Sequence, residues 1–372
     1  MSKNVIIILI DGGRTDRAKK FNAFKKLESN SIFFPNSITY APYTTGAMHA
    51  VLSGSYGNRT GTNSYWHILQ FKKNQFLTLT EYLKQNAYYT YADGHSELII
   101  PKQGFDKFNI HNENDVNLIE HHNNILNKMK NVEDKGKPFF LFLTYSNIHT
   151  GIMNNVLKVF NNFSQEYFEN KYENEKRYDE LFKNADEYLE KILQKINELQ
   201  FDKNSIIVVL SDHGISLGEK FGERAYGAFC YDYTLKTFCY INSPEIKPKI
   251  IDQQIRHIDI MPTILDMLDI SVNTNYENID GVSLMPLIKG NDVDENIAYS
   301  ETGNPLNEKA PPKEPNTHSI RTKNWKLIYN SYNDSKELYD LKNDPEENNN
   351  LIEEKLEIES ILWKQLLKIK NS

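Results

Sequence analysis

The sequence contains few cysteines and no long apolar segment. Its two cysteines, Cys230 and Cys239, have neither the number of a disulfide framework nor the spacing of a zinc site, so we interpret them as small buried side chains. The N-terminal apolar run, Val5–Ile10, is far shorter than the roughly 20 residues of a membrane span and shorter than the apolar core of a signal peptide. We therefore expect a cytoplasmic protein without a membrane span, in which Val5–Ile10 is a buried strand.

A surplus of positive charge is also missing. The chain has 43 Lys and Arg residues against 50 Asp and Glu residues, which gives a formal net charge of −7. Proteins that bind nucleic acids usually carry a basic face, so no nucleic-acid partner is expected. A small anionic ester substrate is compatible with this charge, because a local metal ion can outweigh a weak global charge.

The sequence does contain short apolar runs separated by helical patterns. Three runs, Val5–Ile10, Phe139–Tyr145 and Ser205–Leu210, have the length and composition of strands that are buried on both faces. Helical patterns lie between them, at Leu79–Asn86, Asp115–Lys130 and Tyr178–Leu199. This alternation predicts an α/β fold, a three-layer sandwich with a large, mostly parallel sheet.

A change in composition after about residue 290 predicts two units. We expect a catalytic α/β domain over residues 1–290, in which residues 154–198 form a helical insertion or cap. Residues 291–372 are expected to form a C-terminal subdomain with a small antiparallel sheet and a final helix. Its predicted elements are the strands Ser319–Thr322, Trp325–Tyr329 and Glu337–Tyr339 and a helix over Leu351–Lys368.

Ionisable residues follow the apolar runs. Asp11 comes directly after the first run, and Asp212 and His213 follow the third. In parallel sheets, sites form where strands end, and carboxylate oxygens with an imidazole nitrogen suit Zn or Mn better than Ca or Mg. Each signal alone has an ordinary explanation, since an Asp at a strand end can cap a helix and Asp-Gly is a common turn pair.

The segment Ala41–Gly61 connects these residues to a known family. It has a Pro-Tyr pair followed by Thr44, then Ser53-Gly54, and then Tyr56 and Arg59. This arrangement resembles the segment around the nucleophile of the sulfatase family, in the alkaline-phosphatase superfamily. Further blocks of that family follow in the same order along nearly the whole chain: Gly104–Phe108, Pro138–Tyr145, Asp259–Leu265, Asp280–Leu284, Arg321–Ile328 and Glu337–Leu341.

The resemblance implies a catalytic centre with one divalent metal ion, Mn or Zn in the first place and Ca or Mg as alternatives. The implied metal ligands are Asp11, Thr44, Asp212 and His213. Thr44 stands at the nucleophile position, and Thr45 is the fallback. His149 and His95 are the expected catalytic histidines, which would bind ester oxygens or protonate the leaving group. The weaker candidates are Arg59, Lys220 and Arg224.

The sequence departs from a true sulfatase at the nucleophile. Sulfatases make a formylglycine from the Cys or Ser of a Cys/Ser-x-Pro-x-Arg signature, whereas Thr44–Met48 reads Thr-Thr-Gly-Ala-Met. Gly12 replaces the second Asp of the family, and Gly227 replaces a lysine. No formylglycine is therefore expected. The set of residues resembles the single-metal phosphonate and phosphodiester hydrolases and the phosphoglycerol and phosphoethanolamine transferases.

These points predict a metal-dependent hydrolase that cleaves a phosphate- or phosphonate-type ester through a covalent intermediate on Thr44. Three alternatives stay open. The first is a sulfuric ester hydrolase that lacks formylglycine, the second is a phosphotransferase to an alcohol acceptor, and the third is a non-catalytic binding protein on the same fold. The natural substrate and the oligomeric state do not follow from the sequence.

Overall fold

The computed structural model describes residues 3–155, 165–223, 225–306 and 310–372. Within these residues the main element is a nine-stranded sheet with the order β4-β3-β5-β1-β6-β7-β2-β8, and β9 pairs with β2. The strands are β1 (Asn4–Ile10), β2 (Ile32–Ile38), β3 (Tyr89–Gly94), β4 (Lys107–Ile110), β5 (Phe139–Tyr145), β6 (Ser205–Leu210), β7 (Lys236–Asn242), β8 (Lys249–Ile250) and β9 (Ile255–Arg256). Strand β7 is antiparallel to β6 and β2, and the other pairs are parallel, which confirms the mostly parallel sheet.

The three predicted strands form the centre of this sheet. Strand β1 lies between β5 and β6, and every residue of the three strands is buried. Successive side chains of a strand point to opposite faces. Ile6 and Ile8 of β1 accordingly belong to one apolar cluster, and Val5 and Ile7 belong to the other. Burial on both faces is the reason why these strands read as continuous apolar runs.

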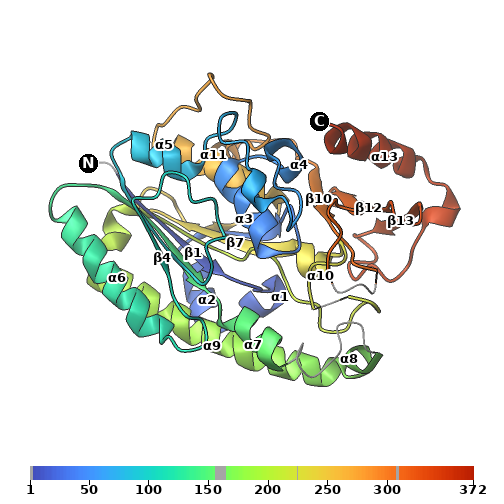
Figure 1. The fold of residues 1–372 in the computed structure, drawn as a ribbon, viewed down its shortest axis with the longest axis horizontal. Helices are drawn as coiled ribbons and strands as arrows, with labels where there is room; N and C mark the ends of the chain where they lie inside the picture. The colour runs from blue at the N-terminus through green and yellow to red at the C-terminus, as the bar shows by residue number, and fades with distance from the viewer. Residues whose placement is uncertain (1–2, 156–164, 224, 307–309) are drawn as a thin grey trace.

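Helices cover both faces of the sheet, so the three-layer sandwich is confirmed (Figure 1). One layer contains α2 (Asn22–Glu28), α6 (Leu118–Glu133) and α9 (Lys171–Glu198), and the other contains α3 (Thr44–Ser53), α5 (Leu79–Gln85) and α11 (Ile260–Met267). Helix α9 buries an apolar stripe at helical spacing, which includes Tyr178, Phe182 and Leu189. It packs against α2, α6 and α7 (Asn147–Asn155). Of the expected insertion over 154–198, residues 156–164 lie outside the described part of the chain.

A second, antiparallel sheet of four strands follows in the described C-terminal residues, as expected. Its order is β10 (Ala298–Thr302), β11 (Thr317–Arg321), β12 (Trp325–Asn330) and β13 (Ser335–Asp340). Helix α13 (Glu357–Lys370) packs on β11 and β12. Figure 1 shows this unit at one end of the main sheet. The buried carboxylate of Asp232, in α10 (Asp232–Leu235), joins the two parts because it accepts hydrogen bonds from Arg321 and Lys326.

Among the described residues, no helix combines the length and the apolar character that a membrane crossing requires.

Candidate active site

The site lies at the carboxyl edge of the central strands. Ile10 pairs with Tyr145 of β5, and Leu9 pairs with Leu210 of β6. Continuing this register places Asp11 level with Asp212. The ligand atoms of Asp11, Asp212 and His213 lie within 4.8 Å of one another, and all three side chains are fully buried. The structure therefore brings together the three residues that the strand ends had indicated.

Backbone contacts orient these side chains. The N–H of Gly12 donates to Asp212 Oδ1 at 3.0 Å. His213 Nδ1 lies 2.8 Å from the carbonyl oxygen of Gly214, so Nδ1 carries the proton and Nε2 offers its lone pair. His213 Nε2 is 3.4 Å from Asp212 Oδ2 and 3.8 Å from Asp11 Oδ1. Within the described residues, these two carboxylate oxygens have no hydrogen-bond partner.

The donor set fits a divalent metal ion. Burial, followed by the charges of Asp212 and Glu113, raises the pKa of Asp11 well above its ordinary value. Two adjacent buried carboxylates without a cation are costly, because neither has water to stabilise its charge. Two partnerless carboxylate oxygens and one imidazole nitrogen are the ligand types that Zn and Mn accept. Asp11, Asp212 and His213 would hold such an ion.

Thr44 is the first residue of α3 and faces this trio. Its Oγ1 lies 3.4 Å from Asp11 Oδ2 and 3.5 Å from His213 Nε2. Thr44 is 8% exposed and therefore counts among the buried polar residues. The N-terminus of the helix favours negative charge at this position. In contrast, the buried Oγ1 of Thr45 makes no hydrogen bond within the described residues.

Gly46 explains how the chain enters α3. A Cβ at Gly46 would lie 2.8 Å from the Cβ of Ala41 and 2.8 Å from the ring of Tyr43. The glycine thus allows the ring of Tyr43 to pack beneath the first turn of α3. This packing fixes the entry of the helix that carries Thr44.

The two predicted histidines lie beside the trio. His149, on α7, has its Nδ1 3.9 Å from Asp11 Oδ1. His95 directly follows β3, and its ring stacks on that of His149 with centroids 5.6 Å apart. Burial lowers the pKa of His95 to about 4, with a further contribution from His149, and burial also lowers the pKa of His149. Both rings are therefore neutral near pH 7, and each offers one N–H donor.

Two residues at the site, Tyr226 and Glu113, were not predicted from the sequence. The ring of Tyr226 stacks on His213 at 4.6 Å between centroids, and its hydroxyl lies 3.2 Å from His149 Nδ1. Glu113 acts on the pKa of Asp11, His95 and His149 through its charge. Tyr226 precedes Gly227, which stands where the family has a lysine, and this was the one clue to its place.

The weaker candidates make other contacts. Arg59 forms an ion pair with Asp280 at 2.7 Å, and the ammonium group of Lys220 donates to the carbonyl oxygen of Glu347. Arg224 lies outside the described residues.

Gly12 stands where the family has a second acidic residue, and a side chain there would be strained. Its φ of +75° lies in the left-handed region, and a Cβ there would be 3.2 Å from the side chain of Ile215 and 3.4 Å from that of Ile148. A carboxylate at this position would meet apolar atoms and a strained backbone. The structure thus supports a site with one acidic residue after β1.

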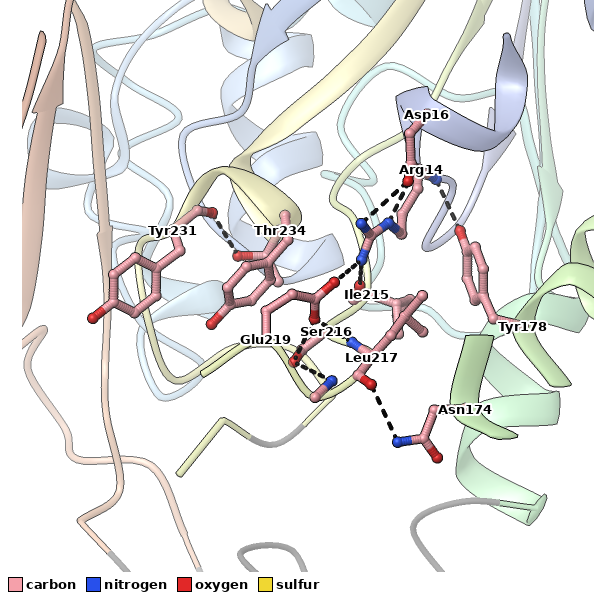
Figure 2. Close-up of polar contacts among 12 residues, drawn as sticks. Arg14, Asp16, Asn174, Tyr178, Ile215, Ser216, Leu217, Glu219, Tyr231 and Thr234 are labelled. Atoms are coloured by element: carbon pink, nitrogen blue, oxygen red, sulfur yellow. Dashed lines mark hydrogen bonds and ion pairs between the residues drawn. The ribbon is translucent and has the colours of Figure 1, made fainter. Parts of the chain in front are cut away.

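Arg14 ties the loop after β1 to the loop after β6 (Figure 2). Its guanidinium donates to the carbonyl oxygen of Ile215 at 2.8 Å and to Glu219 Oε1 at 2.6 Å. Side chains of α9 hold both loops, since the hydroxyl of Tyr178 accepts a hydrogen bond from the N–H of Arg14 and Asn174 Nδ2 donates to the carbonyl oxygen of Leu217. Asp11, Asp212 and His213 therefore stand on loops that are fixed to each other and to a long helix.

The fold and the buried trio resemble those of hydrolases of the alkaline-phosphatase type. The chain belongs to the sulfatase family: the family profile described as Sulfatase matches residues 3–270, and the profile described as N-sulphoglucosamine sulphohydrolase, C-terminal, matches residues 223–372.

Known proteins give the same picture. The choline-sulfatase of Rhizobium meliloti (strain 1021) is 26% identical over 168 residues, which are 45% of this chain and 31% of the relative. This chain thus matches about a third of the length of that relative. A solved 2-O GAG sulfatase superposes with a TM-score of 0.80 at 18% identity, over 100% of this chain and 93% of the other. The phosphonate monoester hydrolase of Agrobacterium radiobacter gives 0.77 at 14% identity, over 99% and 95%.

The comparisons also bear on the substrate. Both family descriptions and two of these three relatives name sulfatases, whereas one names a phosphonate hydrolase. They favour the alternative of a sulfuric ester hydrolase over the phosphate or phosphonate ester that the threonine had suggested. The expected preference was drawn from a few positions, the missing signature at Thr44–Met48 together with Gly12 and Gly227, and the family matches over residues 3–270 and 223–372 outweigh it.

Proposed function

We propose that this protein hydrolyses a sulfuric ester at the carboxyl edge of the main sheet, with Thr44 as the nucleophile. The observation that carries the proposal is the approach of Thr44 Oγ1 to Asp11 and His213, at 3.4 and 3.5 Å. Beside them lie two buried carboxylate oxygens, Asp11 Oδ1 and Asp212 Oδ2, that have no hydrogen-bond partner in the described part of the chain. The sulfatases among its relatives support a sulfate ester as the substrate.

A divalent cation belongs to this proposal. Asp11, Asp212, His213 and Thr44 would hold it, with Mn or Zn favoured by the imidazole ligand and Ca or Mg as alternatives. When bound, such an ion lowers the pKa of a hydroxyl that it contacts and neutralises charge on an ester oxygen.

Residues of the protein would carry out the bond-forming and proton-transfer steps. Thr44 Oγ1 forms a bond to the sulfur atom while the bond from sulfur to the alcohol oxygen breaks, and water later releases sulfate from Thr44. Asp11 Oδ2, 3.4 Å from Thr44 Oγ1, is placed to accept the hydroxyl proton. The N-terminus of α3 stabilises negative charge on Oγ1.

His149 and His95 are proposed to bind the non-bridging oxygens of the ester. Both rings are neutral near pH 7, because burial lowers the pKa of each of them. When Tyr226 donates its hydroxyl proton to His149 Nδ1, the other nitrogen of that ring, Nε2, carries the N–H. A fixed N–H donor in a buried site stabilises charge that develops on an ester oxygen.

A phosphate- or phosphonate-type ester is the second candidate. A specific observation favours it: residue 44 is a threonine, which cannot become the formylglycine that the sulfatase signature requires. A hydroxyl nucleophile beside one metal ion suits phosphoryl as well as sulfuryl groups.

A paired assay tests the proposal. The metal-loaded protein is compared on an aryl sulfate and on an aryl phosphodiester or phosphonate, with Asp212→Asn beside it. We expect turnover of the sulfate, and Asp212→Asn should lose both this activity and one equivalent of metal relative to wild type. Asp252→Asn, an exposed carboxylate, is the matched control.

The outcomes separate the candidates. If the protein hydrolyses the phosphodiester or phosphonate and does not hydrolyse the aryl sulfate, the second candidate is the correct function. Full metal content without turnover of any ester would indicate a binding protein on this fold.

A further inference from the structure

A second group of metal-ligating side chains lies outside the site described above. It consists of Asp93, His111, His121 and His122, and we refer to it as the histidine cluster. Asp93 belongs to β3, His111 directly follows β4, and the adjacent pair His121 and His122 lies in the first turns of α6. Three side chains are buried, and that of His121 is 27% exposed.

The geometry converges on one carboxylate. His111 Nδ1 lies 2.7 Å and His122 Nε2 3.0 Å from Asp93 Oδ2, and His121 Nε2 lies 2.8 Å from Asp93 Oδ1. One ligand atom from each of the four residues lies within 4.8 Å of all the others. Three nitrogen atoms and one oxygen atom at this spacing are a set that a single cation with bonds of about 2.0–2.3 Å can gather.

Outer contacts orient the ligands of this cluster. Asn109 Nδ2 donates to Asp93 Oδ1 at 2.5 Å, which fixes the plane of the carboxylate. His122 Nδ1 lies 2.6 Å from the buried hydroxyl of Tyr188, so a proton on Nδ1 leaves Nε2 free to bind metal. Histidines that ligate metals in proteins usually have such a partner on the second ring nitrogen.

We propose that the histidine cluster binds a structural transition-metal ion of the Zn²⁺ type, separate from the metal of the active site. The three imidazoles select against Ca and Mg, which prefer oxygen ligands. All four positions of a tetrahedral ion are filled by protein, as in closed structural sites.

The ion would hold the edge of the main sheet to the helical layer. Strands β3 and β4 form one edge of the sheet, and the cluster joins both to α6. His95 of the active site lies two residues after Asp93. The metal would therefore fix the segment that carries His95, without contact with the substrate.

Zinc binding to single-site variants tests the proposal. Metal-free protein is loaded with Zn²⁺ alone, and bound zinc is counted by elemental analysis after removal of the excess. We expect two equivalents in wild type, one in the double variant His121→Gln/His122→Gln, and one in Asp212→Asn. His67→Gln, a histidine outside both sites, should keep two. Tyr188→Phe should keep the second ion but bind it roughly tenfold more weakly.

Thermal unfolding gives a second measurement. In the Asp212→Asn background, Zn²⁺ should raise Tm, since an ion that binds only the folded state stabilises it. The increase in Tm should disappear when His121→Gln is added. This single change replaces a partly exposed side chain, so it can be used if the double variant does not fold.

Three results decide the matter. An Asp212→Asn protein that binds no zinc would overturn the histidine cluster as a metal site. The same conclusion follows if His121→Gln/His122→Gln retains both equivalents. In the third result, wild type binds one equivalent of zinc. If that ion is lost in His121→Gln/His122→Gln and kept in Asp212→Asn, the result supports the histidine cluster and contradicts the active-site metal.

Discussion

The hydroxyl of Tyr178 donates a hydrogen bond of 2.7 Å to the carbonyl oxygen of Gly12 and accepts one of 2.8 Å from the backbone N–H of Arg14. Tyr178 is fully buried on α9, and Gly12 directly follows the proposed metal ligand Asp11. One side chain of a distant helix thus satisfies two backbone groups of the loop that carries Asp11. The shape of this loop depends on α9 as much as on β1.

Replacing Tyr178 with Phe should loosen this loop. The change removes the Tyr178 hydroxyl from the buried carbonyl of Gly12 and from the part-buried N–H of Arg14, which costs about 1–3 kcal/mol of the free energy of unfolding. We also expect metal affinity at the active site to fall roughly 10–100-fold, since the support of a ligand is removed. Urea unfolding and metal titration measure the two effects.

Tyr240→Phe is the matched control for this change. Tyr240 is a buried tyrosine whose hydroxyl makes no hydrogen bond within the described residues. Its loss should change the stability by less than about 0.5 kcal/mol. Equal effects of the two variants would mean that the Tyr178 hydroxyl does not hold the loop.

Thr44→Ala should abolish turnover while the fold persists. The change removes the hydroxyl that lies 3.4 Å from Asp11 Oδ2 and 3.5 Å from His213 Nε2. Loss of a nucleophile lowers kcat by roughly 10³-fold or more. Steady-state rates on the preferred ester and the Tm of the variant are the measurements. Thr45→Ala should behave like wild type, and if the loss appears there instead, the fallback residue is the nucleophile.

The central strands and the site residues at their ends could be predicted from the sequence for one physical reason. A strand buried on both faces is apolar throughout, and the polar residue that ends it, such as Asp11, then stands out. The edge strand β4 is partly exposed, and its pattern is too weak to recognise. The all-buried strand β10 was missed because it is rich in polar residues.

The remaining parts of the site depend on tertiary packing. Tyr226 and Glu113 reach it from loops that carry no periodic signal. The histidine cluster holds three of the chain's ten histidines, and the pair His121 and His122 is visible in the sequence. Asp93, however, belongs to strand β3, which was not predicted from the sequence. The contact between Asp93 and the pair His121 and His122 could therefore not be predicted either.

His149→Ala should lower kcat by roughly 10²–10³-fold, the usual effect of removing one donor to a developing oxyanion. Because burial keeps the pKa of His149 low, we expect the ring to bind an ester oxygen and not to act as a protonated acid. The loss should therefore be the same for aryl esters with good and with poor leaving groups. A loss that grows as the leaving group becomes more basic would show proton transfer instead. His95→Ala, which removes the stacked neighbour, should have the smaller effect.

Acid sensitivity should arise in part from a histidine that takes no part in the proposed chemistry. His49, on α3, is 3% exposed, and burial lowers its pKa from 6.5 to about 3. The unfolded chain thus binds a proton below pH 6.5 that the folded chain rejects until about pH 3. The contribution of neutral His49 to the free energy of unfolding is fully present above the pKa of this histidine in the unfolded chain. It decreases as the pH falls below that pKa.

His49→Met should remove this contribution. Between about pH 7.5 and about pH 5, wild type should lose about 2 kcal/mol more of its free energy of unfolding than the variant does. His257, whose pKa burial also lowers to about 3, remains in both proteins, so the variant keeps part of the acid sensitivity. Urea unfolding at the two pH values gives the comparison. Identical losses in the two proteins would show that His49 is protonated in the folded state, or that it reaches solvent before the chain unfolds.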